Sequence, residues 1–235
     1  MKKLLYLIAL IPYLSLAQTD NLKIIYDVIL NESSFQNTNS SQYNTLDFNA
    51  QNTNLIFEKS SQNSVCYLEF NAEEDIILQA LISINNPVYF DFKRNKRLIA
   101  NRNDMVIPDS KYLVEYPGKY IWDITTETKQ IGNYTCYKAI LQRIENSKDT
   151  FFPVTAWFCP ELPINAGFSK YNGLPGMILE LHENYISYMA QNVSFNTVSD
   201  ISIPKLRIIT LEKYLNELDK LKKENPQFFP KEVFN

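Results

Sequence analysis

Apolar and polar residues alternate with a period of two along most of this chain. Residues 87–102, PVYFDFKRNKRLIANR, alternate on both sides of a charged tip and predict a β-hairpin. Other runs read as strands in the same way: 22–30, 54–61, 64–70, 111–117, 119–125, 133–144, 151–158 and two within 177–195. Seven or more strands at near-regular spacing, mostly joined by short turn signals such as Pro117-Gly118, indicate an antiparallel sheet.

The C-terminal region has a different period. Five apolar residues repeat there at helical spacing: Leu211, Tyr214, Leu215, Leu218 and Leu221. This pattern predicts an amphipathic helix of about four turns, with Thr210 as N-cap and Asn225-Pro226 as its stop. The apolar stripe needs a surface to cover, and the open face of a sheet supplies one.

The predicted fold is therefore α+β and mainly β: a curved antiparallel sheet with a C-terminal amphipathic helix packed on it. A half-barrel cradling a helix, like that of the LolA and LolB lipoprotein carriers, would satisfy these elements. Residues 73–83 admit two interpretations. Asn71 and Glu74 could cap a short helix, whereas the isoleucine-rich DIILQALISI also fits a strand.

The first residues predict export. Two lysines precede an apolar run over residues 4–14, and small residues follow at positions 15 and 17. This is typical of a secretory signal peptide over residues 1–17, which leaves residues 18–235 as a single β-rich domain. No later apolar run is long enough to cross a bilayer. We expect a soluble mature protein that is periplasmic or secreted.

Composition removes several function classes. The net charge of −3 and the pI near 5.4 give no reason to expect a nucleic-acid partner. The basic cluster at residues 93–97 is interpreted as a solvated hairpin tip. Three cysteines without a close pair, and one histidine, do not suffice for a zinc site. No motif indicates a cofactor.

Three of the five glycines lie in GFSKYNGLPGMILEL, residues 167–181. A phosphate loop would need a following helix and a lysine at the right spacing, and a nucleophile elbow would need a serine or cysteine between the glycines. Neither is present. Pro175-Gly176 suits the central positions of a type II turn that leads into the next strand.

The hexapeptide at residues 173–178, GLPGMI, resembles the signature of the GLPGLI family of exported Bacteroidetes proteins. WDITTETKQIGNYTCYKA and TAWFCPELPINAGFSKYNGLPG also resemble conserved segments of that family. Phe168 stands where the family usually has proline, and Gly132 lies one place early. The resemblance implies a protein of the cell envelope, and the family has no established activity. It marks Gly167, Gly173 and the Leu174-Pro175-Gly176 run as a structural motif.

Several residues in these segments are candidates for a site. Lys138, Trp157, Tyr171 and Glu180 are interpreted as ligand-binding residues. Glu161 and Glu180, with Lys138, could instead serve a carboxylate-dependent hydrolase if they converge in a cleft. His182 is interpreted as an exposed turn residue.

Cys136 and Cys159 have a geometric relation. If residues 133–144 and 154–158 form a hairpin, positions whose numbers add to about 295 face each other, and this pair adds to 295. Directly opposed residues on neighbouring strands approach disulfide spacing, so the two could form a disulfide. Cys66 is interpreted as a buried free thiol.

The leading hypothesis is a non-catalytic binding or accessory protein of the cell envelope. It rests on an aromatic-rich β chain without a nucleophile–base pair or metal ligands. Its partner would be an outer-membrane protein or an apolar ligand held in the concavity of the sheet. The alternatives are the hydrolase and a periplasmic carrier of an apolar or lipid ligand.

Overall fold

The structure, a computed structural model, describes residues 21–30, 53–70, 86–100, 111–144, 153–183 and 186–226. The expected signal peptide at 1–17 and the alternative over 73–83 lie outside these described residues. The described strands and helix are β1 (Leu22–Leu30), β2 (Thr53–Lys59), β3 (Asn63–Phe70), β4 (Val88–Asp91), β5 (Lys96–Ala100), β6 (Tyr112–Glu115), β7 (Tyr120–Ile131), β8 (Tyr134–Ile144), β9 (Val154–Cys159), β10 (Met177–Glu183), β11 (Ile186–Phe195), β12 (Arg207–Thr210) and α2 (Leu211–Glu224).

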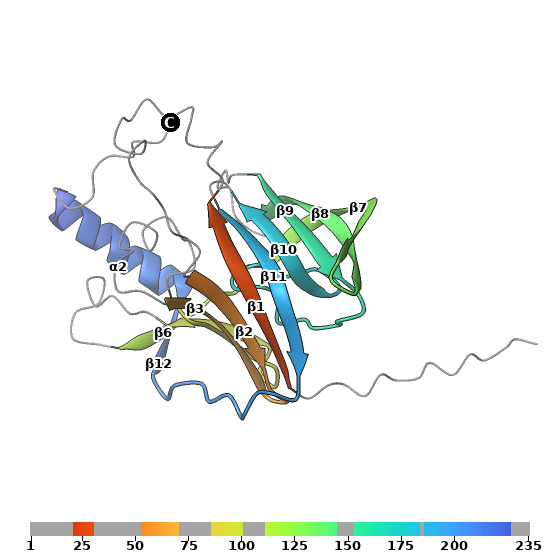
Figure 1. Ribbon diagram of the computed structural model, residues 1–235. Helices are drawn as coiled ribbons and strands as arrows, with labels where there is room; N and C mark the ends of the chain where they lie inside the picture. Colours follow the sequence, from red (N-terminus) through yellow and green to blue (C-terminus); the bar gives the residue numbers. More distant parts are fainter. Residues whose placement is uncertain are drawn as a thin grey trace, which may run out of the picture.

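All of these strands belong to one sheet, in the order β12-β6-β5-β4-β3-β2-β1-β11-β10-β9-β8-β7. Neighbouring strands run antiparallel, except that β12 runs parallel to β6. The sheet is strongly curved and its two edges, β12 and β7, do not pair (Figure 1). The predicted mainly β fold with a curved sheet and a C-terminal helix is confirmed, and it is consistent with a half-barrel.

The connection between β6 and β7 explains how the sheet curls. These strands lie near opposite edges of the sheet, yet only residues 116–119 separate them. Five residue steps span at most about 18 Å, so the two sides of the sheet must approach each other here. Pro117-Gly118 thus marks a crossing between sheet edges and not a turn between neighbouring strands.

The interior of the curve is filled by the chain itself. Alternate residues of β1 are buried, as period-two patterning predicts: Leu22, Ile24, Tyr26 and Val28. They pack in one cluster with six residues of the 160–176 loop between β9 and β10: Leu162, Ile164, Ala166, Phe168, Tyr171 and Leu174. The Phe168 ring lies 4.9 Å from Tyr26 and 5.3 Å from Tyr188, centroid to centroid. The glycine-rich loop therefore occupies the concavity.

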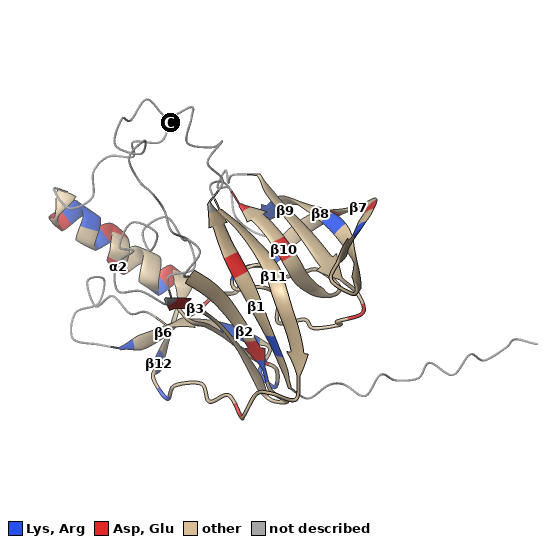
Figure 2. Cartoon of the chain, viewed as in Figure 1, with Lys and Arg blue, Asp and Glu red and all other residues tan. Residues whose placement is uncertain are grey.

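The helix begins and ends as its sequence predicts. The Thr210 side chain accepts a hydrogen bond from the Lys213 backbone N–H, and the Asn225 N–H bonds to the Leu221 carbonyl. Leu211 and Tyr214 of α2 pack against a small second cluster on β6 and β12, which consists of Tyr112, Val114 and Ile209. No residue of α2 is fully buried, and charged positions of both signs recur along its length (Figure 2). The helix covers one end of the sheet only.

The hairpin predicted for residues 87–102 is confirmed as β4 and β5. Its basic cluster is only partly solvated. Lys93 and Arg94 are exposed, but Arg97 is 5% exposed, so the interpretation of the whole cluster as a solvated tip is wrong. Arg97 stands opposite Phe90 in the ladder, and strand alternation turns both toward the inner face.

Candidate functional site

Three of the four predicted binding residues are neighbours on the outer face of the sheet. Lys138 on β8 stands opposite Trp157 on β9, and Trp157 stands opposite Glu180 on β10. Side chains directly opposed across strands lie about 5 Å apart at their Cβ atoms. The antiparallel register therefore gathers residues that are more than forty positions apart in the sequence.

A continuous chain of polar contacts runs through Glu180. Lys129 Nζ lies 2.5 Å from Glu180 Oε2, and His182 Nε2 lies 2.5 Å from Glu180 Oε1. The other ring nitrogen of His182, Nδ1, is 2.7 Å from Ser187 Oγ. We call these four residues the Glu180 relay. Because Glu180 and His182 are two apart on β10, and His182 faces Ser187 on β11, all three share one face.

The hydrogen-bond partners of Glu180 lower the pKa of this carboxyl group, which favours its ionised form. Burial on its own would raise the pKa of Glu180, since only 4% of the residue is exposed. Hydrogen bonds from His182 and Lys129, together with their charges, outweigh burial and lower its pKa. Glu161, the other carboxylate considered for hydrolysis, is exposed in the loop after β9 and takes no part in the relay.

Two lysines flank the Trp157 ring. Lys129 Nζ lies 4.5 Å from the ring centroid and Lys138 Nζ lies 6.0 Å from it, both within cation–π range. Lys138 forms its ion pair with Glu127, at 3.0 Å, and not with the relay carboxylate. The structure thus supplies Lys129, rather than the Lys138 considered from the sequence, as the partner of Glu180.

Tyr171 lies elsewhere, inside the core. Its residue is 3% exposed, and its hydroxyl donates to Glu183 Oε2. Glu183 also accepts a hydrogen bond from Tyr188, at 3.3 Å, and pairs with Lys170 at 3.6 Å. Burial, followed by the charge of Glu183, raises the pKa of Tyr171. The sequence gives no sign of this internal network, because the path of the loop that contains Tyr171 decides whether this tyrosine reaches Glu183 on β10.

His182 and Ser187 were not identified as site residues from the sequence. His182 lies within β10 and not in the turn expected for it, and its side chain is 41% exposed. The signal was present in the pattern Glu-x-His on one strand face. Reading the following hairpin in register would have placed Ser187 opposite His182.

The glycine stretch is structural, for reasons that differ from the type II turn expected. Gly167 and Gly173 adopt positive φ, +72° and +93°, whereas Gly176 does not. A Cβ on Gly176 would lie 2.2 Å from the Cys159 carbonyl oxygen, and one on Gly173 would lie 2.5 Å from that of Tyr120. Close backbone approach therefore requires glycine at position 176.

The register predicted for the two cysteines holds along β8 and β9, where paired residues add to 295. Cys136 and Cys159 are both fully buried, and the structure contains them and Cys66 as free thiols. A hydrogen bond from Cys136, joined by backbone N–H groups of Leu162 and Glu161, lowers the pKa of Cys159. Their disulfide remains a prediction.

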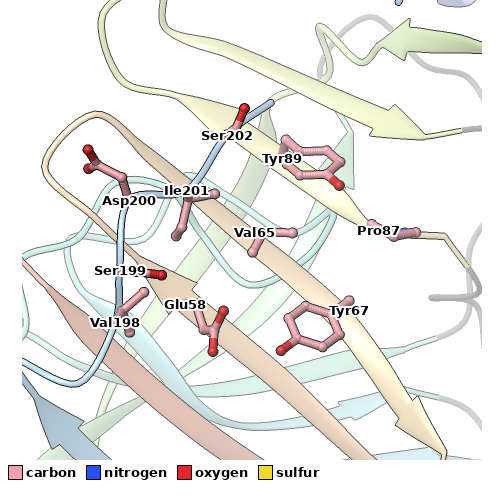
Figure 3. Close-up of a pocket in the computed structure, with 10 residues that line it drawn as sticks. All are labelled: Glu58, Val65, Tyr67, Pro87, Tyr89, Val198, Ser199, Asp200, Ile201 and Ser202. Atoms are coloured by element: carbon pink, nitrogen blue, oxygen red, sulfur yellow. The ribbon is translucent and has the colours of Figure 1, made fainter. Parts of the chain in front are cut away.

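A hollow of about 370 Å³ lies on the outer face of β2, β3 and β4, beside residues 198–202. Figure 3 shows the Tyr67 and Tyr89 rings along one side, with Val65 between them and Glu58 across from them. Tyr89 stands opposite Val65 in the ladder, which makes the two tyrosines diagonal neighbours about 7–8 Å apart. We call this site the tyrosine hollow.

In the part of the chain that the structure describes, no cluster of three or more His, Cys, Asp or Glu is placed to hold a metal ion. Among the same residues, no helix combines the length and apolar character needed to span a membrane.

The model of a protein family of unknown function, Porph_ging, matches residues 122–152 and 145–180. Over this segment the chain resembles the Porph_ging family. The segment covers β7, β8, β9, the glycine-rich loop and the start of β10, and it contains Lys129, Trp157 and Glu180. A family of unknown function fits the resemblance inferred from the sequence motifs and assigns no reaction to the relay.

Two solved structures of PNGF-II, in space groups C2 and P21, are similar in fold, with TM-scores of 0.52 and 0.53. They are 15% and 14% identical in sequence and match 86% of this chain. The chain spans about a third of the length of PNGF-II, 33% and 34% in the two structures. At such identity the likeness concerns the fold alone. No curated protein matches the chain.

Proposed function

We propose that this protein is a non-catalytic binding protein of the cell envelope that holds a neutral, polyhydroxylated ligand, such as an oligosaccharide, in the tyrosine hollow. The observation that carries the proposal is the pairing of two tyrosine rings with carboxylates and hydroxyls around a concave site. The volume of about 370 Å³ is within the range of small-molecule sites. The concavity of the sheet is filled by the glycine-rich loop, so the proposed ligand site lies on the outer surface.

The chemistry of the lining favours hydroxyl groups. Tyr67 and Tyr89 offer apolar ring faces with polar edges. Glu58 and Asp200 are hydrogen-bond acceptors when ionised, and Ser199 can donate or accept. Glu58 pairs with Lys23 at 3.0 Å, and Asp200 is the second acidic residue of the described lining, which disfavours an anionic ligand. A sugar presents C–H groups to aromatic rings and O–H groups to carboxylates, so it matches both parts of the hollow.

Calorimetric titration with a panel of neutral oligosaccharides tests the proposal. At least one should bind, and Tyr67→Ala should weaken that binding roughly 3- to 10-fold, the range of a lost aromatic contact. Tyr137→Ala is the matched control, because Tyr137 is a 38% exposed tyrosine on β8, outside the hollow. Absence of binding across the panel, or equal losses in the two variants, would overturn the proposal. Release of shorter sugars would overturn its non-catalytic part.

The envelope location is part of the same proposal and rests on the predicted signal peptide. Cell fractionation followed by N-terminal sequencing should find the mature chain beginning at Gln18 outside the cytoplasm. An intact N-terminus in the cytoplasmic fraction would contradict it.

A hydrolase is the second candidate, favoured by the Glu180 relay. In such a reaction Ser187 Oγ would add to the acyl carbon of an ester and pass its proton to His182 Nδ1, while Glu180 stabilised the imidazolium. The C–O bond to the alcohol would then break, the alcohol would take the proton from His182, and water would hydrolyse the acyl-serine. The serine contacts Nδ1 and the acid contacts Nε2, the reverse of the serine-protease arrangement. Ser187 is also only 3% exposed, which restricts access to its hydroxyl.

A fluorophosphonate probe separates the two candidates, since it labels activated serines covalently. The binding proposal expects no labelling of the wild-type protein. Labelling that disappears in Ser187→Ala and persists in Tyr67→Ala would establish the hydrolase in its place.

A further inference from the structure

The guanidinium of Arg97 is buried without its full set of partners. Its Nη2 donates to the Ala166 carbonyl oxygen at 2.5 Å, and the group lies 5.5 Å from the Phe90 ring centroid. Its Nε is buried and has no hydrogen-bond partner. Buried polar groups are nearly always paired, so an unpaired N–H on a charged side chain indicates a missing acceptor.

The charge of Arg97 also lacks a counter-ion among the described residues. No carboxylate there forms an ion pair with it, and Glu115, the acidic residue nearby in the same hollow, is held by Lys96 at 2.7 Å. Burial lowers the pKa of Arg97 to about 10, so it is still charged at neutral pH. A buried charge without a partner is costly, and a bound anion would remove that cost.

Arg97 lines a hollow that can admit such an anion. The hollow has a volume of about 410 Å³, and Lys96, Lys119, Asn172 and Gly173 also line it. It lies beside residues 116–119, where the two sides of the sheet converge. Its charged lining is three cations against one carboxylate, Glu115. By contrast, the charged residues that line the tyrosine hollow are Glu58 and Asp200, of which Glu58 is paired with Lys23.

We propose that this hollow binds a small molecule through an oxyanion group, a carboxylate or a phosphate. Arginine presents adjacent N–H donors in a planar fork that matches two oxygens of such a group, and the unpaired Nε of Arg97 supplies one of these donors. Lys119, which is exposed, adds attraction at the rim. The site is separate from the tyrosine hollow, because Tyr89 and Phe90 point to opposite faces of β4, and it stands whether or not sugars bind there.

Calorimetric titration with succinate and with inorganic phosphate, at ionic strength held constant with sodium chloride, tests the site and distinguishes the two chemistries. One of these probes should bind the wild-type protein measurably. Arg97→Lys keeps the charge but loses the fork, so it should weaken binding at least about tenfold. The heat of binding, and not a rise in melting temperature, decides the test. Phosphate raises the stability of folded proteins by exclusion from their surface even when it does not bind a site.

Lys119→Gln serves as a second variant in case Arg97→Lys does not fold. It should weaken binding roughly 2- to 5-fold, as expected for one exposed charge. Lys93→Gln removes the same charge from the tip of the β4–β5 hairpin, outside the hollow, and should leave binding unchanged. Failure of both probes to bind, or equal losses for Lys93→Gln and Lys119→Gln, would overturn the proposal.

Discussion

At the scale of single residues, the clearest constraint is the contact between the glycine-rich loop and β9. Gly176 brings the loop backbone against the carbonyls that end β9, where a Cβ would meet Cys159 O at 2.2 Å and Pro160 Cα at 3.0 Å. Both contacts are to backbone atoms, which cannot rotate away as a side chain can. The loop has to be displaced if position 176 carries any side chain.

Gly176→Ala should therefore lower the free energy of unfolding by about 2–3 kcal/mol, the cost of overpacking a rigid contact. Urea denaturation followed by tryptophan fluorescence measures this. Gly118→Ala is the matched control, because its nearest contact would be an ordinary 3.5 Å to a side chain of Ile144. If both substitutions lower the free energy of unfolding by the same small amount, the loop can shift to accommodate a Cβ at position 176, and the prediction is wrong.

Glu180 makes stability depend on pH in a defined direction. Its pKa in the folded protein lies below its ordinary value of 4.5, so its partners stabilise the fold fully above pH 4.5. That stabilisation is lost as the pH falls from 4.5 through the lowered pKa of the folded state.

Glu180→Gln should destabilise the protein by about 2 kcal/mol at pH 7, because hydrogen bonds to a charged group are replaced by weaker ones. The difference from the wild-type protein should shrink as the pH falls below 4.5. Chemical denaturation at a series of pH values measures both. A difference that stays constant down to the acid range would contradict the assigned role of the carboxylate.

At the scale of elements, local pairing could be predicted and distant pairing could not. The β8–β9 register and the β4–β5 hairpin follow from alternation around a short connection, which one stretch of sequence contains. The crossing from β6 to β7 was not predictable, because Pro117-Gly118 signals a change of direction and says nothing of the strands that pair. The family-like motifs singled out Lys138, Trp157 and Glu180 as candidate residues. The contact between Ser187 and His182 could be placed only with the β10–β11 register.

The β8–β9 register leads to a prediction for the cysteines. In an oxidising compartment the Cys136 and Cys159 thiols should form one disulfide, passing two electrons and two protons to an oxidant such as oxidised glutathione. Iodoacetamide added to the denatured, unreduced protein should then label Cys66 alone, and prior reduction should expose all three thiols. The bond should add about 3 kcal/mol, given the length of the loop that it closes.

Cys66→Ser tests the pairing, because it should abolish labelling of the unreduced protein. Three labelled thiols in unreduced wild-type protein from an oxidising compartment would contradict the disulfide.

At the scale of the whole molecule, apolar packing is divided unequally. One large cluster joins the inner face of the sheet to the glycine-rich loop. Among the described residues, the second cluster, at the end formed by β6, β12 and α2, consists of Tyr112, Val114 and Ile209, with Leu211 and Tyr214 packed against it. Helix propensity and caps are visible in the sequence, but the extent of burial is set by tertiary packing.

Hydrogen exchange should reveal this division. Backbone amides of β12 and α2 should exchange well before those of β1 and β10, because little apolar contact holds that end to the rest. Tyr214→Ala should speed exchange in α2 and leave β1 unchanged. Equal protection of all four elements would show that the fold opens as one unit.

The position of β1 has a consequence for how the protein acquires its structure. The first described strand lies between β2 and β11, and its partner Phe195 is 173 residues beyond Leu22. The ribosome must therefore release nearly the whole chain before the centre of the sheet can assemble, and such distant pairing makes folding slow. During the predicted export across a membrane, such a delay would keep the polypeptide unfolded.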